Sequence, residues 1–166
     1  DKIIKKKSQN LISNAIFKSC KYKAYVVKKD EKEKNLRAIL NFGHTFAHAL
    51  ETVNKYSNKI IHGEAVLIGM MVASRLSNHM GYLKNNELKE IISLYKKLKL
   101  NFSYKKFVNL KNMKKIFQIM NNDKKSDGKN IKIILLKKIG LSIIKETKLK
   151  KTFIPLIQKD IKNGNY

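Results

Sequence analysis

Residues 37–69 read RAILNFGHTFAHALETVNKYSNKIIHGEAVLIG, and this stretch concentrates the unusual side chains of the protein. It contains three of the four histidines and one of the two arginines in the sequence. Between residues 36 and 53 apolar residues recur every three or four positions without proline, a spacing that predicts one helix. Its polar residues form a single stripe, which we expect to carry the function: Arg37, Asn41, His44, His48 and Glu51.

The imidazoles of this stretch have a spacing that suits metal ligands. His44 and His48 lie one helical turn apart, and His62 opens a second predicted helix, HGEAVLIGMMVASRLSNHMG. The small residues of that helix favour close packing against the first one. Two imidazoles on one face and a third on a neighbouring helix are a credible arrangement for a divalent cation. By spacing alone, all three histidines are candidate ligands.

Length and composition narrow the class of protein. A chain of 166 residues is long enough for one domain with a real core and too short for two ordinary ones. It has no run of 18 apolar residues, so we expect no membrane span. The first residues lack the apolar core of a signal peptide and a starting methionine, which suggests a piece of a longer protein. Cys20 is the only cysteine, which favours a reducing compartment such as the cytosol.

The formal net charge of +25 raises the question of nucleic-acid binding. Nearly all of the basic residues are lysines, spread over the whole chain as in a composition biased toward A and T codons. Base readout usually relies on arginine, and only Arg37 and Arg75 are present. We therefore expect nonspecific attraction to polyanions at low salt and no specific nucleic-acid partner.

Upstream of the histidine motifs, residues 2–28 have the apolar periodicity of an amphipathic helix. Lys23 interrupts its inward stripe, so this side chain either snorkels to solvent or points at an anion in a cleft. The charged segment KKDEKEKN, residues 28–35, is predicted to be a solvated turn. Glu33 stands one turn before Arg37, which predicts an ion pair between them.

Downstream, the pattern predicts further helices and one small sheet. Helices are expected near residues 85–98, at 111–120, and from Thr152 to the end. A polar loop with Lys124 and Lys125 precedes the strand IKIILL, and LSII after Gly140 offers a second strand. The fold class is therefore mainly α with a two-stranded β element near residues 131–145.

The runs LRAILNFGHTFAHALE and HGEAVLIGM resemble the signature of the 3-dehydroquinate synthase family, and KAYVVKKDEKE and DKKSDGKNIKIILL occur in the family's order. The resemblance covers most of residues 20–140. It implies that residues 1–166 form a single helical domain, the C-terminal half of a two-domain enzyme. The other half, an N-terminal α/β domain that binds NAD, is absent here, and the chain has no Gly-rich nucleotide turn.

The resemblance also implies roles for individual residues. His44 and His62 match two ligands of a catalytic Zn²⁺ or Co²⁺, and a third ligand belongs upstream of this chain. His48 matches a residue that contacts substrate and assists proton movement, a role that replaces the ligand role suggested by spacing. Glu33 matches an acidic residue with a proton-transfer role. The groups that match substrate-binding positions are Lys23, Arg37, Asn41 and one of Lys124 or Lys125.

The implied activity is a phosphate-eliminating carbon–oxygen lyase of the shikimate pathway of aromatic amino acid biosynthesis. It converts 3-deoxy-D-arabino-heptulosonate 7-phosphate to 3-dehydroquinate and phosphate by transient oxidation with NAD, elimination, reduction and aldol closure. The full enzyme is expected to be a cytoplasmic homodimer, and the isolated chain is expected to be inactive. The alternatives are another sugar-phosphate cyclase, a metal-dependent alcohol dehydrogenase of the same architecture, or a basic helical nucleic-acid-binding domain.

Overall fold

The computed structural model describes residues 8–34, 36–53, 60–103, 115, 116, 119 and 131–163. It is mainly helical, with one antiparallel sheet of two strands, which confirms the predicted fold class. Within the described residues, no helix is long and apolar enough to cross a membrane. The predicted loop residues Lys124 and Lys125, and most of the predicted helix at 111–120, lie outside the described residues.

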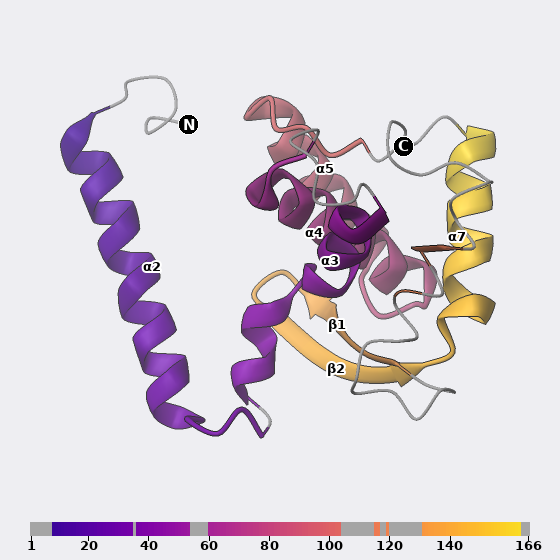
Figure 1. The fold of residues 1–166 in the computed structure, drawn as a ribbon. Helices are drawn as coiled ribbons and strands as arrows, with labels where there is room; N and C mark the ends of the chain where they lie inside the picture. The colour runs from indigo at the N-terminus through magenta and orange to yellow at the C-terminus, as the bar shows by residue number, and fades with distance from the viewer. Residues whose placement is uncertain are drawn as a thin grey trace.

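Helix α2, Gln9–Lys29, extends along one side of the molecule in Figure 1, and its main described contact is with the 3-10 helix η1, Leu36–Asn41. The prediction that the apolar side of this helix faces inward is therefore wrong, because that side is not buried. Ile12 and Ile16, two residues of the predicted stripe, are 36% and 58% exposed, and the buried residue of α2 is Val26, which is not on that stripe. Lys23 is exposed as well, so it does not reach into a covered face. The apolar residues of α2 do recur with helical spacing, but no described element covers the side on which they lie.

The predicted continuous helix over residues 36–53 is also wrong, because the chain breaks at Gly43. Residues before the break form η1, and those after it form α3, His44–Val53. Gly43 has φ of +84°, a left-handed conformation that glycine adopts without the usual steric cost. Arg37 and Asn41 thus lie on a different element from His44 and His48, and the predicted single stripe does not exist.

Helices α3 and α4, His62–His79, pack tightly against each other. A Cβ atom at Gly69 would lie 2.2 Å from the carbonyl oxygen of Gly43 and 3.1 Å from the amide nitrogen of Ala47. Only a residue without a side chain permits this approach. The small residues of the second histidine motif therefore serve the close packing that the sequence predicts.

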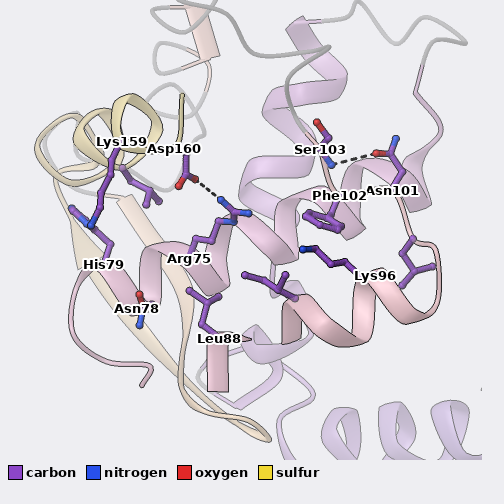
Figure 2. Close-up of a pocket in the computed structure, with 13 residues that line it drawn as sticks. Arg75, Asn78, His79, Leu88, Lys96, Asn101, Phe102, Ser103, Lys159 and Asp160 are labelled. Atoms are coloured by element: carbon purple, nitrogen blue, oxygen red, sulfur yellow. Dashed lines mark hydrogen bonds and ion pairs between the residues drawn. The ribbon is translucent and has the colours of Figure 1, made fainter. Parts of the chain in front are cut away.

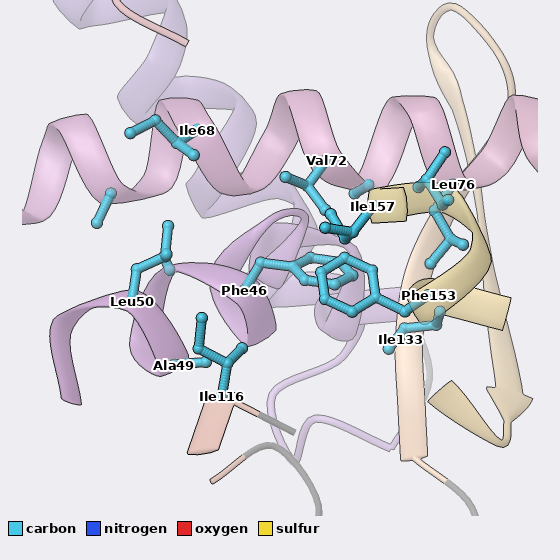
Figure 3. Packing of buried hydrophobic residues seen from close by; sticks show 14 of the residues in the cluster. Phe46, Ala49, Leu50, Ile68, Val72, Leu76, Ile116, Ile133, Phe153 and Ile157 are labelled. Atoms are coloured by element: carbon cyan, nitrogen blue, oxygen red, sulfur yellow. The ribbon is translucent and has the colours of Figure 1, made fainter. Parts of the chain in front are cut away.

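The remaining elements enclose the core around α3 and α4. Helix α5, Asn85–Lys97, is followed by strands β1, Ile131–Lys138, and β2, Leu141–Thr147, and by helix α7, Leu149–Asn163. Figure 3 shows the rings of Phe46 and Phe153 side by side within the aliphatic cluster, with centroids 5.1 Å apart. The Ser77 hydroxyl accepts a hydrogen bond from the amide of Leu136 at 2.9 Å, which ties β1 to α4.

The hydroxyl of Tyr95 on α5 gives a pH-dependent contribution to stability. Burial raises the pKa of Tyr95 above its ordinary value, and the hydroxyl donates a hydrogen bond to the Leu67 carbonyl at 3.3 Å. As pH rises past about 10, the unfolded chain loses this proton before the folded one does, so stability falls. We expect urea unfolding between about pH 9 and about pH 11 to show a shallower loss of stability in Tyr95→Phe than in the wild type. The exposed Tyr22→Phe serves as control, and an equal slope in Tyr95→Phe and wild type would contradict the assignment.

Candidate functional site

Three imidazoles meet where α3 and α4 begin. His44 is the first residue of α3, His62 is the first residue of α4, and His48 follows His44 by one turn. The ring centroids of His44 and His62 are 5.7 Å apart, and that of His48 lies 5.9 Å from His44 and 6.4 Å from His62. We call this group the histidine cluster. The two helices approach closely at Gly43, which directly precedes His44, and at Gly69, which lies two turns after His62.

The His44 and His62 pair fits the geometry of two ligands on one cation. A tetrahedral metal about 2.1 Å from one nitrogen of each ring would place the two centroids roughly 5 Å apart. The observed 5.7 Å needs only a small adjustment. In addition, Nδ1 of His44 is buried and has no hydrogen-bond partner among the described residues. A buried polar atom without a partner is costly, so a ligand at the cluster would relieve that cost.

Glu51, one turn after His48 on α3, forms a hydrogen bond with the ring of His62. Its Oε1 lies 2.9 Å from Nδ1 of His62, and the Glu51 side chain is 11% exposed while that of His62 is 60% exposed. A carboxylate that accepts the Nδ1 proton fixes the ring orientation and leaves Nε2 as the donor atom for a metal. The sequence places Glu51 on the polar stripe but assigns it no role. The sequence feature that could have indicated this role is the position of Glu51 three residues after His48, on the helix face that we expected to face the motif beginning at His62.

The described residues do not form a closed metal site by themselves. Among them, no three His, Cys, Asp or Glu side chains are arranged to hold a metal ion. The geometry thus offers two imidazoles as metal ligands, and other donor groups would have to complete the coordination. The assignment of His44 and His62 as ligands, with His48 outside the ligand set, stays a prediction.

A second polar group lies at the turn between α2 and η1. The Asp30 carboxylate accepts hydrogen bonds from the amides of Lys34 at 2.8 Å and Arg37 at 2.9 Å. Nη1 of Arg37 donates to the Glu31 carbonyl at 2.8 Å, and the Asn41 amide donates to Glu33 at 2.9 Å.

The predicted ion pair between Glu33 and Arg37 is therefore wrong. Glu33 adopts φ of +51°, and its carboxylate accepts the amide of Asn41 instead. Because residues 36–41 form a 3-10 helix after a tight turn, the helical spacing from which the pair was predicted does not apply. Glu33 and Asn41 are still brought together, and Asn41 lies three residues ahead of His44.

Lys23 does not join either group in this structure. It lies on the exposed surface of α2, and no hydrogen bond or ion pair links it to the histidine cluster within the described residues. Lys124 and Lys125 fall outside those residues. The substrate-binding roles of all three lysines stay predictions.

Solved structures share this fold. The 2-epi-5-epi-valiolone synthase of Streptomyces hygroscopicus subsp. jinggangensis 5008, solved with NAD+ and Zn²⁺ bound, matches with a TM-score of 0.63 and 24% identity over 82% of this chain and 37% of that one. A 2-deoxy-scyllo-inosose synthase complexed with carbaglucose-6-phosphate, NAD+ and Co²⁺ matches with a TM-score of 0.57 and 26% identity over 78% and 35%. The fold is thus the helical part of the dehydroquinate synthase-like architecture.

Sequence relatives narrow the class to one family. Residues 1–126 match the family described as 3-dehydroquinate synthase C-terminal. The chain is 49% identical over 129 residues to the 3-dehydroquinate synthase of Endomicrobium trichonymphae, covering 77% of this chain and 34% of that protein. It is 42% identical over 160 residues to that of Pelagibacter ubique, covering 96% and 43%. The chain belongs to the 3-dehydroquinate synthase family, which confirms the resemblance, and it spans less than half the length of these relatives.

Proposed function

We propose that this chain is the metal- and substrate-binding domain of a 3-dehydroquinate synthase. The reaction is the conversion of 3-deoxy-D-arabino-heptulosonate 7-phosphate to 3-dehydroquinate and phosphate. The observation that carries the proposal is the histidine cluster at the joined starts of α3 and α4. Membership of the family supports the choice of this reaction over that of other enzymes with the same fold.

The metal would be held by His44 and His62, with Glu51 fixing the ring of His62. The buried, unpartnered Nδ1 of His44 and the spacing of the two rings support this assignment. When bound, a zinc or cobalt ion supplies Lewis acidity toward a substrate hydroxyl, and NAD, held mainly by an N-terminal domain, supplies reversible hydride transfer.

The chain's own residues bind the substrate and move protons. The substrate carries a carboxylate and a phosphate, so cations at several angles are needed to fix it. Arg37, bonded to the Glu31 carbonyl, and Asn41, bonded to the Glu33 carboxylate, would grip the carboxylate and hydroxyl end. Lys23 and one of Lys124 or Lys125 would hold the phosphate. The exposed imidazole of His48 is positioned to accept or return a proton beside the cluster, and Glu33 is a second proton carrier.

We place the protein in the cytosol as a homodimer, with residues 1–166 forming one domain that works against an NAD-binding partner domain. Cys20 is free and exposed, as suits a reducing compartment. The exposed apolar residues of α2 support contact with a further domain or subunit, because a stable monomer would leave fewer of them in water.

The test is phosphate release from the seven-carbon substrate in the presence of NAD and Zn²⁺. We expect turnover by the protein with its N-terminal domain and none by residues 1–166 alone. Arg37→Gln should lower kcat/KM by about a hundredfold, because a charged hydrogen bond to the substrate is lost. The exposed Lys28→Gln, which also removes one charge, should leave kcat/KM unchanged. Turnover of another sugar phosphate in place of the heptulosonate, or turnover by residues 1–166 alone, would contradict the proposal.

A further inference from the structure

A cavity of about 580 Å³ opens among α4, α5 and α7, away from the histidine cluster (Figure 2). Arg75 lines it from α4, Lys96 from α5 and Lys159 from α7. Arg75 lies 13 residues after His62 on the same helix, which at 1.5 Å per residue is roughly 20 Å along the axis. The cavity is therefore separate from the site to which the proposed reaction is assigned. Its volume falls in the range of pockets that hold small molecules.

The walls of this cavity divide by chemistry. Its apolar part comes from α5, α7 and the segment after α5, and consists of Leu88, Ile92, Leu100, Phe102 and Leu156. The ring of Phe102 is braced edge-on by Tyr95, with centroids 5.7 Å apart, so this wall is held in place. Among the described residues, the charged part brings the cations of Arg75, Lys96 and Lys159 against one carboxylate, that of Asp160. Such a cavity matches a ligand with an apolar body and an anionic end.

Arg75 is the strongest sign that the charged part binds something. The residue is 8% exposed, and its Nη1 donates to Asp160 at 3.0 Å in an ion pair whose side chains are each 9% exposed. Nε of the same guanidinium is buried and has no hydrogen-bond partner among the described residues. Leaving a charged donor unsatisfied in a buried position is costly. Asp160 thus fixes the guanidinium of a residue that lines the cavity, and the buried Nε of that guanidinium has no partner among the described residues.

We propose that this cavity is a binding site for a small organic acid, separate from the histidine cluster. The carboxylate of the ligand would accept hydrogen bonds from Arg75, with Lys96 and Lys159 completing its charge balance. The apolar body would lie against Phe102 and its aliphatic neighbours. Charge-assisted hydrogen bonds set the preference for the ionised acid, and the apolar wall sets the preference for a ring over a bare inorganic anion.

The experiment compares naphthoate with its neutral isostere naphthamide by isothermal titration calorimetry on the protein. We expect naphthoate to bind at least about tenfold more tightly than naphthamide, and inorganic phosphate to bind more weakly than naphthoate. The double variant Lys96→Gln with Lys159→Gln should weaken naphthoate binding about tenfold and leave naphthamide binding unchanged. Both lysines are exposed, so the fold should be retained.

Two further variants locate the site. Arg75→Lys keeps a cation for Asp160 but removes the planar fork and its Nε, so naphthoate should bind about tenfold more weakly. The matched control for the double variant Lys96→Gln with Lys159→Gln is Lys18→Gln with Lys21→Gln on the exposed surface of α2, which removes the same two charges and should have no effect. Equal binding of naphthoate and naphthamide, or equal loss in the α2 control and the cavity variants, would overturn the proposal. Because the readout is binding, it stands or falls independently of the proposed activity.

Discussion

Replacing Gly69 by alanine is expected to destabilise the protein by about 3 kcal/mol, although alanine is the better helix former. The new methyl group would lie 2.2 Å from the carbonyl oxygen of Gly43. That oxygen accepts the hydrogen bond from the Ala47 amide at 3.0 Å, which closes the first turn of α3. The methyl group therefore collides with the backbone at the start of α3, where no flexible side chain can move away. Relief requires α3 and α4 to separate, and His44 moves with the start of α3.

The matched control is Gly63→Ala, which lies in the same helix with nothing within 4 Å of its added Cβ. There the substitution should be neutral or stabilising by about 0.5 kcal/mol, because alanine loses less conformational freedom on folding. Urea unfolding of both variants measures the difference. A Gly69→Ala protein as stable as Gly63→Ala would show that the two helices are not in close contact at Gly43.

The same contact explains what the sequence predicts and what it misses around the site. The start of α4 at His62 is predicted correctly, because the apolar periodicity changes there. The break at Gly43 is missed, because one glycine inside a periodic run is also compatible with a continuous helix. The left-handed conformation of Gly43 is coupled to the approach of Gly69 from another helix, and that contact has no signature in the local sequence.

Helix α2 and Glu51 are two further cases in which the local sequence does not predict contacts between separate elements. Periodicity predicts that α2 is amphipathic, but it cannot say whether another element covers the apolar side, and Ile12 and Ile16 of that side are exposed in the described structure. Glu51 is visible on the polar stripe, but its bond to His62 joins residues from two helices. The resemblance to family motifs predicts which residues belong to the site. Which of these residues contact each other depends on how the helices pack, and the local sequence does not show that.

The largest effect on ligand binding is expected for zinc uptake. His44→Ala and His62→Ala should each lower zinc affinity by about a hundredfold or more, because each removes one of the two imidazoles assigned as ligands. His48→Ala should change it by less than about threefold, although its ring lies 5.9 Å from that of His44. Equilibrium dialysis of the protein against buffered Zn²⁺ measures all three, with no need for turnover. A loss in His48→Ala as large as in His62→Ala would return His48 to the ligand set that spacing alone suggests.

Glu51→Gln adds a test of how His62 is held. The amide can still accept the Nδ1 proton but lacks the charge that raises the basicity of the ring, so zinc affinity should fall by about tenfold, less than for removal of the ring itself. Because Glu51 lies 2.9 Å from His62 and has no assigned contact with substrate, this loss would report the effect of the carboxylate charge on the basicity of the His62 ring and not ligation by Glu51. If Glu51→Gln bound zinc as tightly as the wild type while His62→Ala did not, the carboxylate would serve packing alone. If all these variants bound zinc alike, the metal would lie elsewhere, and the convergence of α3 and α4 at the histidine cluster would need another explanation.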